Sequence, residues 1–354
     1  MSHAELATRF LLQLTIILAA CRCLGLLARR IGQPQAMAEM IAGVILGPSV
    51  FGLMWPAAEG YIFPVESQSV LLTVSQIGVA LYMLLVGLEF RTDLFRSHVR
   101  AAASISIAGM LVPLAFGVTV GWWLMQSPGV FFPVTVRVWE GAVFLGAAMC
   151  ITAFPMLARI IQEQGLMGTV VGTLSLAAGA VGDAAAWCLS VVVLSRTEGN
   201  PAMVMLGAFL LGCAIPRGDV SRALTRWAGP LATAILIPVF FAYSGLHTRL
   251  DLVDSPYLWF VTGVVLFAAC IGKGGGCWAA ARLNGEDQRT ALAVGALMNA
   301  RGLMELILLN AGLERGIITP TLFSIMVVMA IVTTLMTTPL LRRLYPVQAL
   351  ARPS

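Results

Sequence analysis

Charged residues are scarce in this chain, and their scarcity excludes most water-soluble folds. Asp, Glu, Lys and Arg make up 11% of the 354 residues, whereas soluble domains average roughly 25%. Lysine occurs once, as Lys273. Hydrophobic residues reach 59%, so we expect a chain embedded in a lipid bilayer rather than a soluble globule.

The sequence also lacks the clusters that hold metals, disulfides or nucleic acid. Its seven cysteines fall in or beside apolar stretches, and no CxxC pair or Cys/His cluster occurs. We therefore predict no disulfide, no metal site and no cofactor. The net charge is +5, but the basic residues form no dense cluster, which argues against a nucleic-acid partner. They are spread through short loops, where they set membrane orientation.

Apolar stretches predict about eleven transmembrane helices in an all-α polytopic membrane protein. Counting Lys and Arg on alternate sides gives fourteen on one side and five on the other. This bias predicts an N-terminus outside and a cytoplasmic C-terminus, as in a bacterial inner membrane protein. The expected spans are 10–28, 36–54, 69–88, 101–125, 139–162, 169–195, 201–216, 230–247, 256–283, 289–311 and 318–341.

A weak internal repeat divides the chain into two five-helix halves, 36–195 and 201–341, within one membrane domain spanning 1–354. An odd number of helices per half places the second half upside down in the membrane, an arrangement typical of secondary transporters. Three motifs recur in the same order: AGVILGP with LGAFLLGCAIP, VGLEFRTDL with SGLHTRLDL, and ITAFPMLARII with MNARGLMELIL.

The span 169–195 carries one carboxylate, Asp183, near its middle. A charge at mid-membrane costs at least ~2.5–3.5 kcal/mol on insertion scales and is seldom present without a function. The flanking small residues, such as Gly182 and Ala184, allow another backbone or an ion to approach closely. We expect Asp183 to bind and release a cation; the alternative is a protonated carboxyl group that only hydrogen-bonds a neighbouring helix.

Two other spans carry helix breakers or polar groups at matching places in the two halves. Pro155 removes a backbone donor and disfavours helix at Phe154, which predicts a break with free carbonyls beside the Thr152 hydroxyl. Such oxygens suit a desolvated Na+ or K+, although a proline kink can also serve packing alone. The matching segment in the second half runs through Asn299 to Glu305.

Arg301 and Glu305 lie four residues apart in that second segment, so they can pair on one helix face and reduce each other's burial cost. We expect them to hold the broken helix in shape rather than to bind the ion. Lys273 lies in CIGKGGGCW, which lacks the Ser or Thr and the spacing of a phosphate-binding loop. Two interpretations of Lys273 stay open: a lysine snorkelling to the surface and a buried partner of Asp183.

These motifs together resemble one family, the monovalent cation/proton antiporters, and in particular its branch of plant cation/proton exchangers, bacterial sodium/proton antiporters and gated potassium efflux systems. The resemblance covers about residues 36–341. It implies two crossed discontinuous helices beside the Asp183 helix, in a core domain that works against a dimerisation domain, and hence a homodimer. The matching motifs are AEMIAGVILGPSVFG, LYMLLVGLEF, ITAFPMLARII, PVFFAYSGLHT and ALMNARGLMELILLNAGL.

The same resemblance implies roles for single residues. Asp183 binds a monovalent cation and a proton alternately, and Thr152 lines that site. Phe154, Pro155, Asn299 and Lys273 support it, Lys273 matching the core lysine of the family. Arg301 and Glu305 stabilise the core.

The chain departs from the family at two places. Many members carry Asp, Asn or Gln where this chain has Gly182, so one ligand is missing and electroneutral exchange is expected. Only 196–201 separates the Asp183 helix from the next span, so two linking helices are missing. The chain shows no nucleotide-binding domain, which leaves room for a separate cytoplasmic regulatory subunit.

The sequence therefore predicts exchange of Na+ or K+ for H+ by alternating access, without enzyme activity. Two alternatives stay open: a channel-like potassium efflux component and a transport-inactive membrane scaffold or sensor derived from an antiporter. An intramembrane hydrolase is least consistent with the sequence, because Asp183 has no second catalytic Asp at matching depth and no Ser/His or metal constellation occurs.

Overall fold

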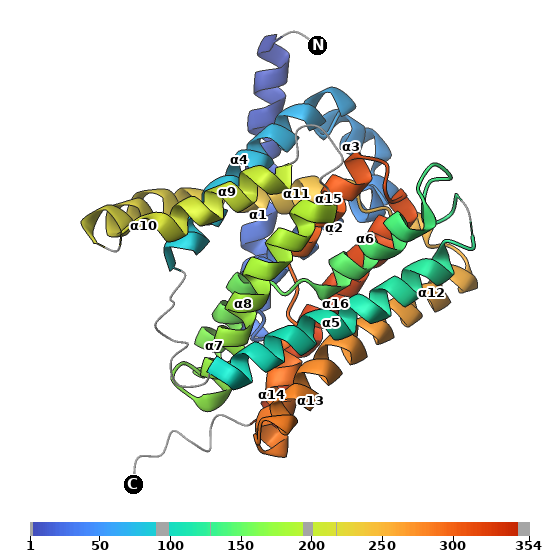
Figure 1. Ribbon diagram of the computed structural model, residues 1–354. Coiled ribbons are helices and arrows are strands. Elements are labelled where there is room, and N and C mark those ends of the chain that lie inside the picture. Colours follow the sequence, from blue (N-terminus) through green and yellow to red (C-terminus); the bar gives the residue numbers. More distant parts are fainter. Residues whose placement is uncertain (1–2, 90–98, 128, 194–200, 217, 346–354) are drawn as a thin grey trace. The chain divides into compact units, whose positions relative to one another are not determined.

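The structure, a computed structural model, describes residues 3–89, 99–127, 129–193, 201–216 and 218–345. Across these ranges the chain forms helices joined by turns, with no β-strand (Figure 1). Each of the eleven predicted spans coincides with one helix or one interrupted helix. Among the residues that the structure describes, eight helices are long and apolar enough to cross a membrane. The all-α polytopic class is therefore confirmed, while the number of crossings stays a prediction.

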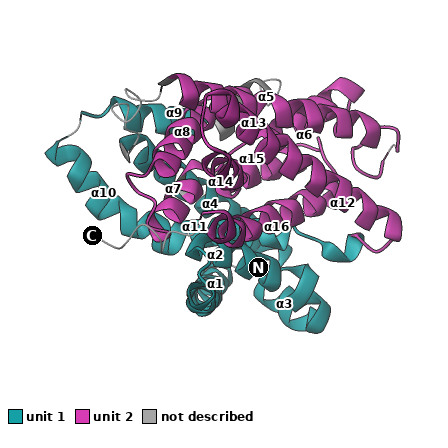
Figure 2. Cartoon of the chain, turned by 90° about the horizontal axis from the view of Figure 1, so that it is seen from below, with its two compact units in different colours: residues 1–90, 197–252 teal, residues 91–196, 253–354 magenta. Residues whose placement is uncertain are grey.

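The chain divides into two compact units, shown in two colours in Figure 2. Unit 1 consists of Met1–Phe90 and Thr197–Leu252, and unit 2 of Arg91–Arg196 and Val253–Ser354. Each unit therefore draws one part from each of the two predicted repeats. The repeats themselves, and the single domain over 1–354, stay predictions.

Two helices of unit 1, α2 (Gln35–Leu46) and α11 (Ile237–Leu246), pack closely at one glycine each. A Cβ atom on Gly43 would collide with the Phe241 carbonyl, and one on Gly245 would collide with the Gly43 backbone. Glycine at both places lets the two helices touch backbone to backbone, as small residues commonly do in membranes. The helices of unit 1 are α1 (His3–Arg30), α2 (Gln35–Leu46), α3 (Pro56–Ile62), α4 (Val65–Glu89), α9 (Pro201–Ala214), α10 (Asp219–Leu231) and α11 (Ile237–Leu246).

Unit 2 contains all the predicted site residues. Its longest helices are unbroken, whereas three others are interrupted near their middles. It comprises α5 (Val99–Leu124), α6 (Val138–Cys150), α7 (Phe154–Glu163), α8 (Val170–Val193), α12 (Pro256–Ala269), a π-helical turn (Cys270–Gly275), α13 (Gly276–Leu283), α14 (Gln288–Met298), α15 (Leu303–Glu314) and α16 (Pro320–Leu344).

Both predicted helix breaks are confirmed. The first lies between α6 and α7, over residues 151–153, and Pro155 falls in the first turn of α7, where a missing N–H costs nothing. The second lies between α14 and α15, over residues 299–302. Each break leaves helix ends, with their unpaired backbone groups, inside a segment of membrane-spanning length.

Candidate functional site

The two helix breaks meet inside unit 2. The backbone N–H of Ala153 donates to the carbonyl of Ala300 at 3.3 Å. Residues 147 positions apart in the sequence are thus joined through their non-helical peptides. The polar groups of both breaks therefore share one place in the fold.

The end of α6 is capped by side chains from the second half of the chain. The Arg301 guanidinium donates to the Met149 carbonyl at 2.9 Å and to the Ala148 carbonyl at 3.4 Å, and the Lys273 ammonium donates to the Cys150 carbonyl. The remaining carbonyl of the last turn, on Ala147, accepts from the Cys150 thiol at 3.2 Å. The four carbonyls that a helix end leaves without partners are all bonded here.

This capping corrects one expectation about the first break. The carbonyls of α6 are not free, because cationic side chains occupy them. Those of Ile151 and Thr152 lie within the break itself and accept no hydrogen bond from the residues that the structure describes. At the first break, the backbone oxygens available to an ion are therefore the carbonyls of Ile151 and Thr152.

Arg301 and Glu305 pair at 3.4 Å, and both side chains are fully buried, which confirms the predicted pairing. Thr334 on α16 fixes the peptide of Arg301 as well. Its hydroxyl accepts from the Arg301 N–H at 2.9 Å and lies 3.0 Å from the Arg301 carbonyl. Thr334 was not predicted from the sequence. The run of threonines in VTTLMTT, within an apolar helix, is the signal that could have indicated it.

Asp183 lies on α8, and 1% of its surface is exposed. Within the described part of the chain, neither of its carboxylate oxygens has a hydrogen-bond partner. The groups acting on it electrostatically are the Phe154 backbone amide, at the N-terminus of α7, and Lys273. A helix N-terminus carries partial positive charge and favours an anion, so the carboxylate lies in a favourable field.

Lys273 does not form an ion pair with Asp183 in this conformation. It is fully buried, so the snorkelling interpretation is wrong, and its ammonium group is bonded to the Cys150 carbonyl. Lys273 influences Asp183 through its charge while capping α6. The sequence indicated that Lys273 is buried, but it did not indicate that Lys273 caps α6, because the acceptor, the Cys150 carbonyl, lies 123 residues away.

Two hydroxyl groups lie beside Asp183's neighbour, Gly182. A Cβ atom on Gly182 would lie 3.4 Å from the Ser106 hydroxyl and 4.0 Å from the Thr152 hydroxyl. Both residues are 2% exposed. The position at which the sequence resemblance implies a polar side chain thus faces two hydroxyls here. Ser106, on α5, was missed because nothing local distinguishes it from other serines of apolar helices.

The remaining predicted residues lie around the same breaks. The Asn299 amide donates to the Cys270 carbonyl at 3.5 Å, linking the second break to the π-helical turn that carries Lys273. Phe154 is half-buried at the start of α7. No cluster of three His, Cys, Asp or Glu side chains occurs in the described ranges.

An unpaired carboxylate, two nearby hydroxyls and a helix N-terminus lie beside two interrupted helices of membrane-spanning length, an arrangement typical of membrane transporters. The family model "Sodium/hydrogen exchanger, transmembrane" matches residues 14–206 and 201–343. The chain therefore belongs to this family. The two matched segments meet where two linking helices are expected to be missing.

Curated relatives support the assignment. The chain is 34% identical to the Na(+)/H(+) antiporter NhaS4 of Synechocystis sp., over 96% of this chain and 98% of that protein. It is 31% identical to Cation/H(+) antiporter 17 of Arabidopsis thaliana and 29% identical to K(+)/H(+) antiporter 1 of Saccharomyces cerevisiae, covering 95% and 96% of this chain. It spans 48% and 46% of these two proteins, about half their length.

A solved structure shows the same fold. The sodium proton antiporter MjNhaP1 from Methanocaldococcus jannaschii matches with a TM-score of 0.66 over 98% of this chain and 99% of that chain. The sequence identity is 14%, so this likeness concerns the fold alone.

Proposed function

We propose that the chain is a secondary antiporter that exchanges a monovalent cation, Na+ or K+, for H+, with Asp183 as the site that both ions share. The observation that carries the proposal is the unpartnered, buried carboxylate beside two helix breaks that a hydrogen bond joins. A carboxylate in this environment needs a proton or a cation to neutralise it. The relatives named as cation/proton antiporters point the same way.

The cycle follows from competition for one carboxylate. A proton leaves Asp183 on the side of higher pH, and a cation replaces it, with the Thr152 hydroxyl and the carbonyls of the first break as further ligands. The Phe154 amide compensates the charge when neither ion is bound. Unit 2, which contains both breaks, acts as the moving core in alternating access, and unit 1 provides the dimerisation part.

Gly182 bears on the stoichiometry. Because Gly182 supplies no second carboxylate, one cation exchanges for one proton at the single carboxylate of Asp183. The cycle then moves no net charge across the membrane, so it is electroneutral. Each uncompensated charge moved at 100 mV contributes ~2.3 kcal/mol, so an electroneutral cycle responds to the pH and cation gradients and not to voltage. The cytoplasmic C-terminus, the bacterial inner membrane, the homodimer and a separate regulatory subunit belong to the same proposal.

Proton flux in proteoliposomes tests the proposal. A preset pH gradient is challenged with Na+, K+ or Li+ between about pH 6 and pH 9, with the wild-type chain and with Asp183→Asn. We expect cation-dependent collapse of the gradient that disappears in Asp183→Asn. Asp219→Asn, at an exposed position on α10, is the matched control and should transport like the wild type.

A transport-inactive scaffold is the second candidate, favoured by the short link at 196–201. It predicts no cation-dependent flux from well-folded wild-type protein under any of these conditions. That result, obtained with a monodisperse protein that unfolds cooperatively, would overturn the antiporter proposal.

A further inference from the structure

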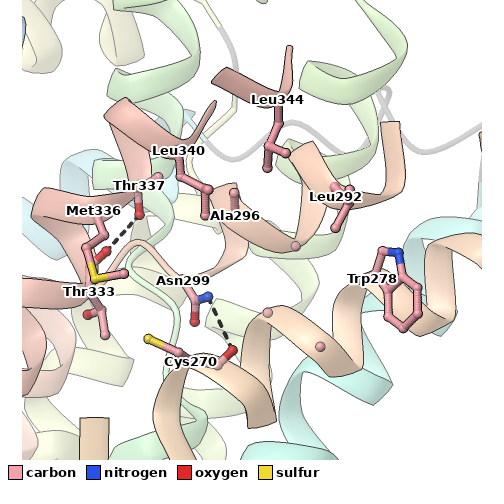
Figure 3. Close-up of a pocket in the computed structure, with 13 residues that line it drawn as sticks. Cys270, Trp278, Leu292, Ala296, Asn299, Thr333, Met336, Thr337, Leu340 and Leu344 are labelled. Atoms are coloured by element: carbon pink, nitrogen blue, oxygen red, sulfur yellow. Dashed lines mark hydrogen bonds between the residues drawn. The ribbon is translucent and has the colours of Figure 1, made fainter. Parts of the chain in front are cut away.

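Unit 2 contains a pocket of ≈ 330 Å³ that the ion site does not use. It lies between α14, α16 and the segment joining the π-helical turn to α13 (Figure 3). Its volume is at the lower end of the range of ~300–1,000 Å³ found for small-molecule sites. The lining residues are mostly apolar: Cys270, Gly274, Gly275, Trp278, Leu292, Gly295, Ala296, Asn299, Thr333, Met336, Thr337, Leu340 and Leu344.

The two lining threonines offer little to a polar ligand. Thr337 donates to the Thr333 carbonyl, and Thr333 donates to the Met329 carbonyl, so each hydroxyl hydrogen is used within α16. Figure 3 shows the Asn299 amide turned toward Cys270, to whose carbonyl it donates. The walls are therefore suited to an apolar occupant.

The pocket runs along two turns of α14. Its lining on α14 begins at Leu292 and ends at Asn299, at the helix break. This lining rises about 10 Å along the helix, and Arg289, one turn before Leu292, lies about 15 Å from Asn299 along the same axis. That is half of the ~30 Å hydrocarbon core, the depth that an acyl chain of one leaflet occupies. The exposed side chains at the rim are Trp278 (37%), Leu340 (40%) and Met336 (47%).

Each of the three helices that line the pocket carries an arginine close to one of its ends. Arg282 lies four residues after Trp278, Arg289 three before Leu292, and Arg343 three after Leu340, spacings that keep each arginine on its lining face. All three are exposed. Arg282 and Arg289 flank the polar turn 284–287, which joins α13 to α14, and Arg343 lies in the last turn of α16.

Two acidic residues of this turn are close to the arginines. The Asp287 carboxylate already accepts from the backbone amides of Arg289 and Thr290, and it caps α14. Glu286 accepts from Arg282 through its backbone carbonyl. With Arg282, Arg289 and Arg343 against Glu286 and Asp287, the end of the pocket keeps a net positive charge.

We propose that this pocket binds an anionic phospholipid, with one acyl chain between α14 and α16 and the phosphate at Arg282, Arg289 and Arg343. Arginine forms paired, charge-assisted hydrogen bonds with phosphate oxygens. Basic pockets between membrane helices are known lipid headgroup sites. Because the inner end of the pocket is Asn299, the bound chain would brace the second helix break.

Lipid binding is measured on the purified full chain, by native mass spectrometry and by thermal unfolding, so it does not depend on transport. The probes are phosphatidylglycerol, phosphatidylcholine with the same acyl chains, and inorganic phosphate. We expect saturable binding and a rise in unfolding temperature with phosphatidylglycerol, weaker effects with phosphatidylcholine and none with phosphate. Equal effects of the two lipids, or an equal effect of phosphate, would overturn the proposal.

Two variants separate the chain site from the headgroup site. At Gly275 an added Cβ meets only an Ile271 methyl group, at 3.8 Å, so Gly275→Leu is expected to fill the pocket without a clash. It should abolish saturable binding of both lipids. Arg289→Gln should weaken phosphatidylglycerol binding about fivefold, the fold-change for about 1 kcal/mol per basic residue, and leave phosphatidylcholine binding unchanged.

The matched controls are Gly263→Leu, on α12 where nothing lies within 4 Å of an added Cβ, and Arg100→Gln, an exposed arginine in the first turn of α5. Both should bind lipid like the wild type. If Gly275→Leu without lipid unfolds at a lower temperature than the wild type, phosphatidylglycerol binding by Arg289→Gln still tests the headgroup site. Unchanged phosphatidylglycerol binding in both variants would contradict the assignment.

Discussion

Replacing Thr334 by valine removes one hydroxyl from α16 and leaves the shape of the side chain almost unchanged. The Arg301 N–H then loses its acceptor, at 2.9 Å in the wild type, in a fully buried place. A buried donor left unpaired costs about 1–3 kcal/mol, whereas hydrogen bonds between membrane helices average about 0.6 and reach about 1.7 kcal/mol. We therefore expect a loss of stability of about 1–2 kcal/mol.

Because large domains shift by about 2–4 °C for each kcal/mol, the unfolding temperature of Thr334→Val should fall by about 2–8 °C. The peptide of Arg301 also carries the guanidinium that caps α6, so the variant should lower the affinity for the transported cation, seen as a raised KM in the proteoliposome assay. Thr334→Ser keeps the hydroxyl and should restore both properties.

The control for Thr334→Val is Thr337→Val on the same helix. Thr337 is equally buried, and its hydroxyl donates only to the Thr333 carbonyl of its own helix. This substitution should change neither KM nor the unfolding temperature by a comparable amount. Equal effects of the two valine variants would show that Thr334 contributes only as a hydroxyl of α16, and the reasoning about Arg301 would be refuted.

Three further predictions concern the site and its surroundings. Lys273→Met leaves the Cys150 carbonyl uncapped, so thermal unfolding should report a loss of about 1–3 kcal/mol; an unchanged unfolding temperature would contradict the cap. Gly182→Asp adds a second carboxylate facing the Ser106 and Thr152 hydroxyls, and proteoliposomes with an imposed membrane potential should then show voltage-dependent flux, absent from the wild type and from Gly182→Asn. Hydrogen bonds from Thr290 and from the Arg289 amide hold the pKa of Asp287 below its usual range, so its contribution to stability is present above about pH 4 and is lost as pH falls through the lowered pKa. Asp287→Ala should lower the unfolding temperature at neutral pH and flatten this acid dependence, whereas an acid dependence equal to that of the wild type would show that another group titrates.

The parts of the site that sequence could predict are those with a local signal. A carboxylate within an apolar run indicated Asp183 as a candidate site residue, and a proline with its neighbours predicted the first break. The spacing of four residues identified the pairing of Arg301 with Glu305. These signals are readable because membrane burial makes any polar residue costly.

What the sequence could not predict depends on contacts between distant segments. The acceptor of Lys273 lies 123 residues away, and Thr334 reaches a peptide 33 residues away. Ser106 faces Gly182 only because α5 packs against α8. The opposite charges of Lys273 and Asp183 suggested that they pair. In the structure Lys273 instead donates to the Cys150 carbonyl, which the end of α6 leaves without a helical partner.

The capped end of α6 has a consequence for how this protein is made. α6 is synthesised first, whereas Lys273 and Arg301 follow 123 residues after Cys150 and 152 residues after Met149. At about 5–20 residues per second, the ribosome needs roughly 6–25 s to reach Lys273. During that interval the last carbonyls of α6 have none of the cationic partners that they have in the finished fold. Until the second half of the chain has been made, the carbonyls at the end of α6 therefore need other hydrogen-bond partners, from water or from the insertion machinery.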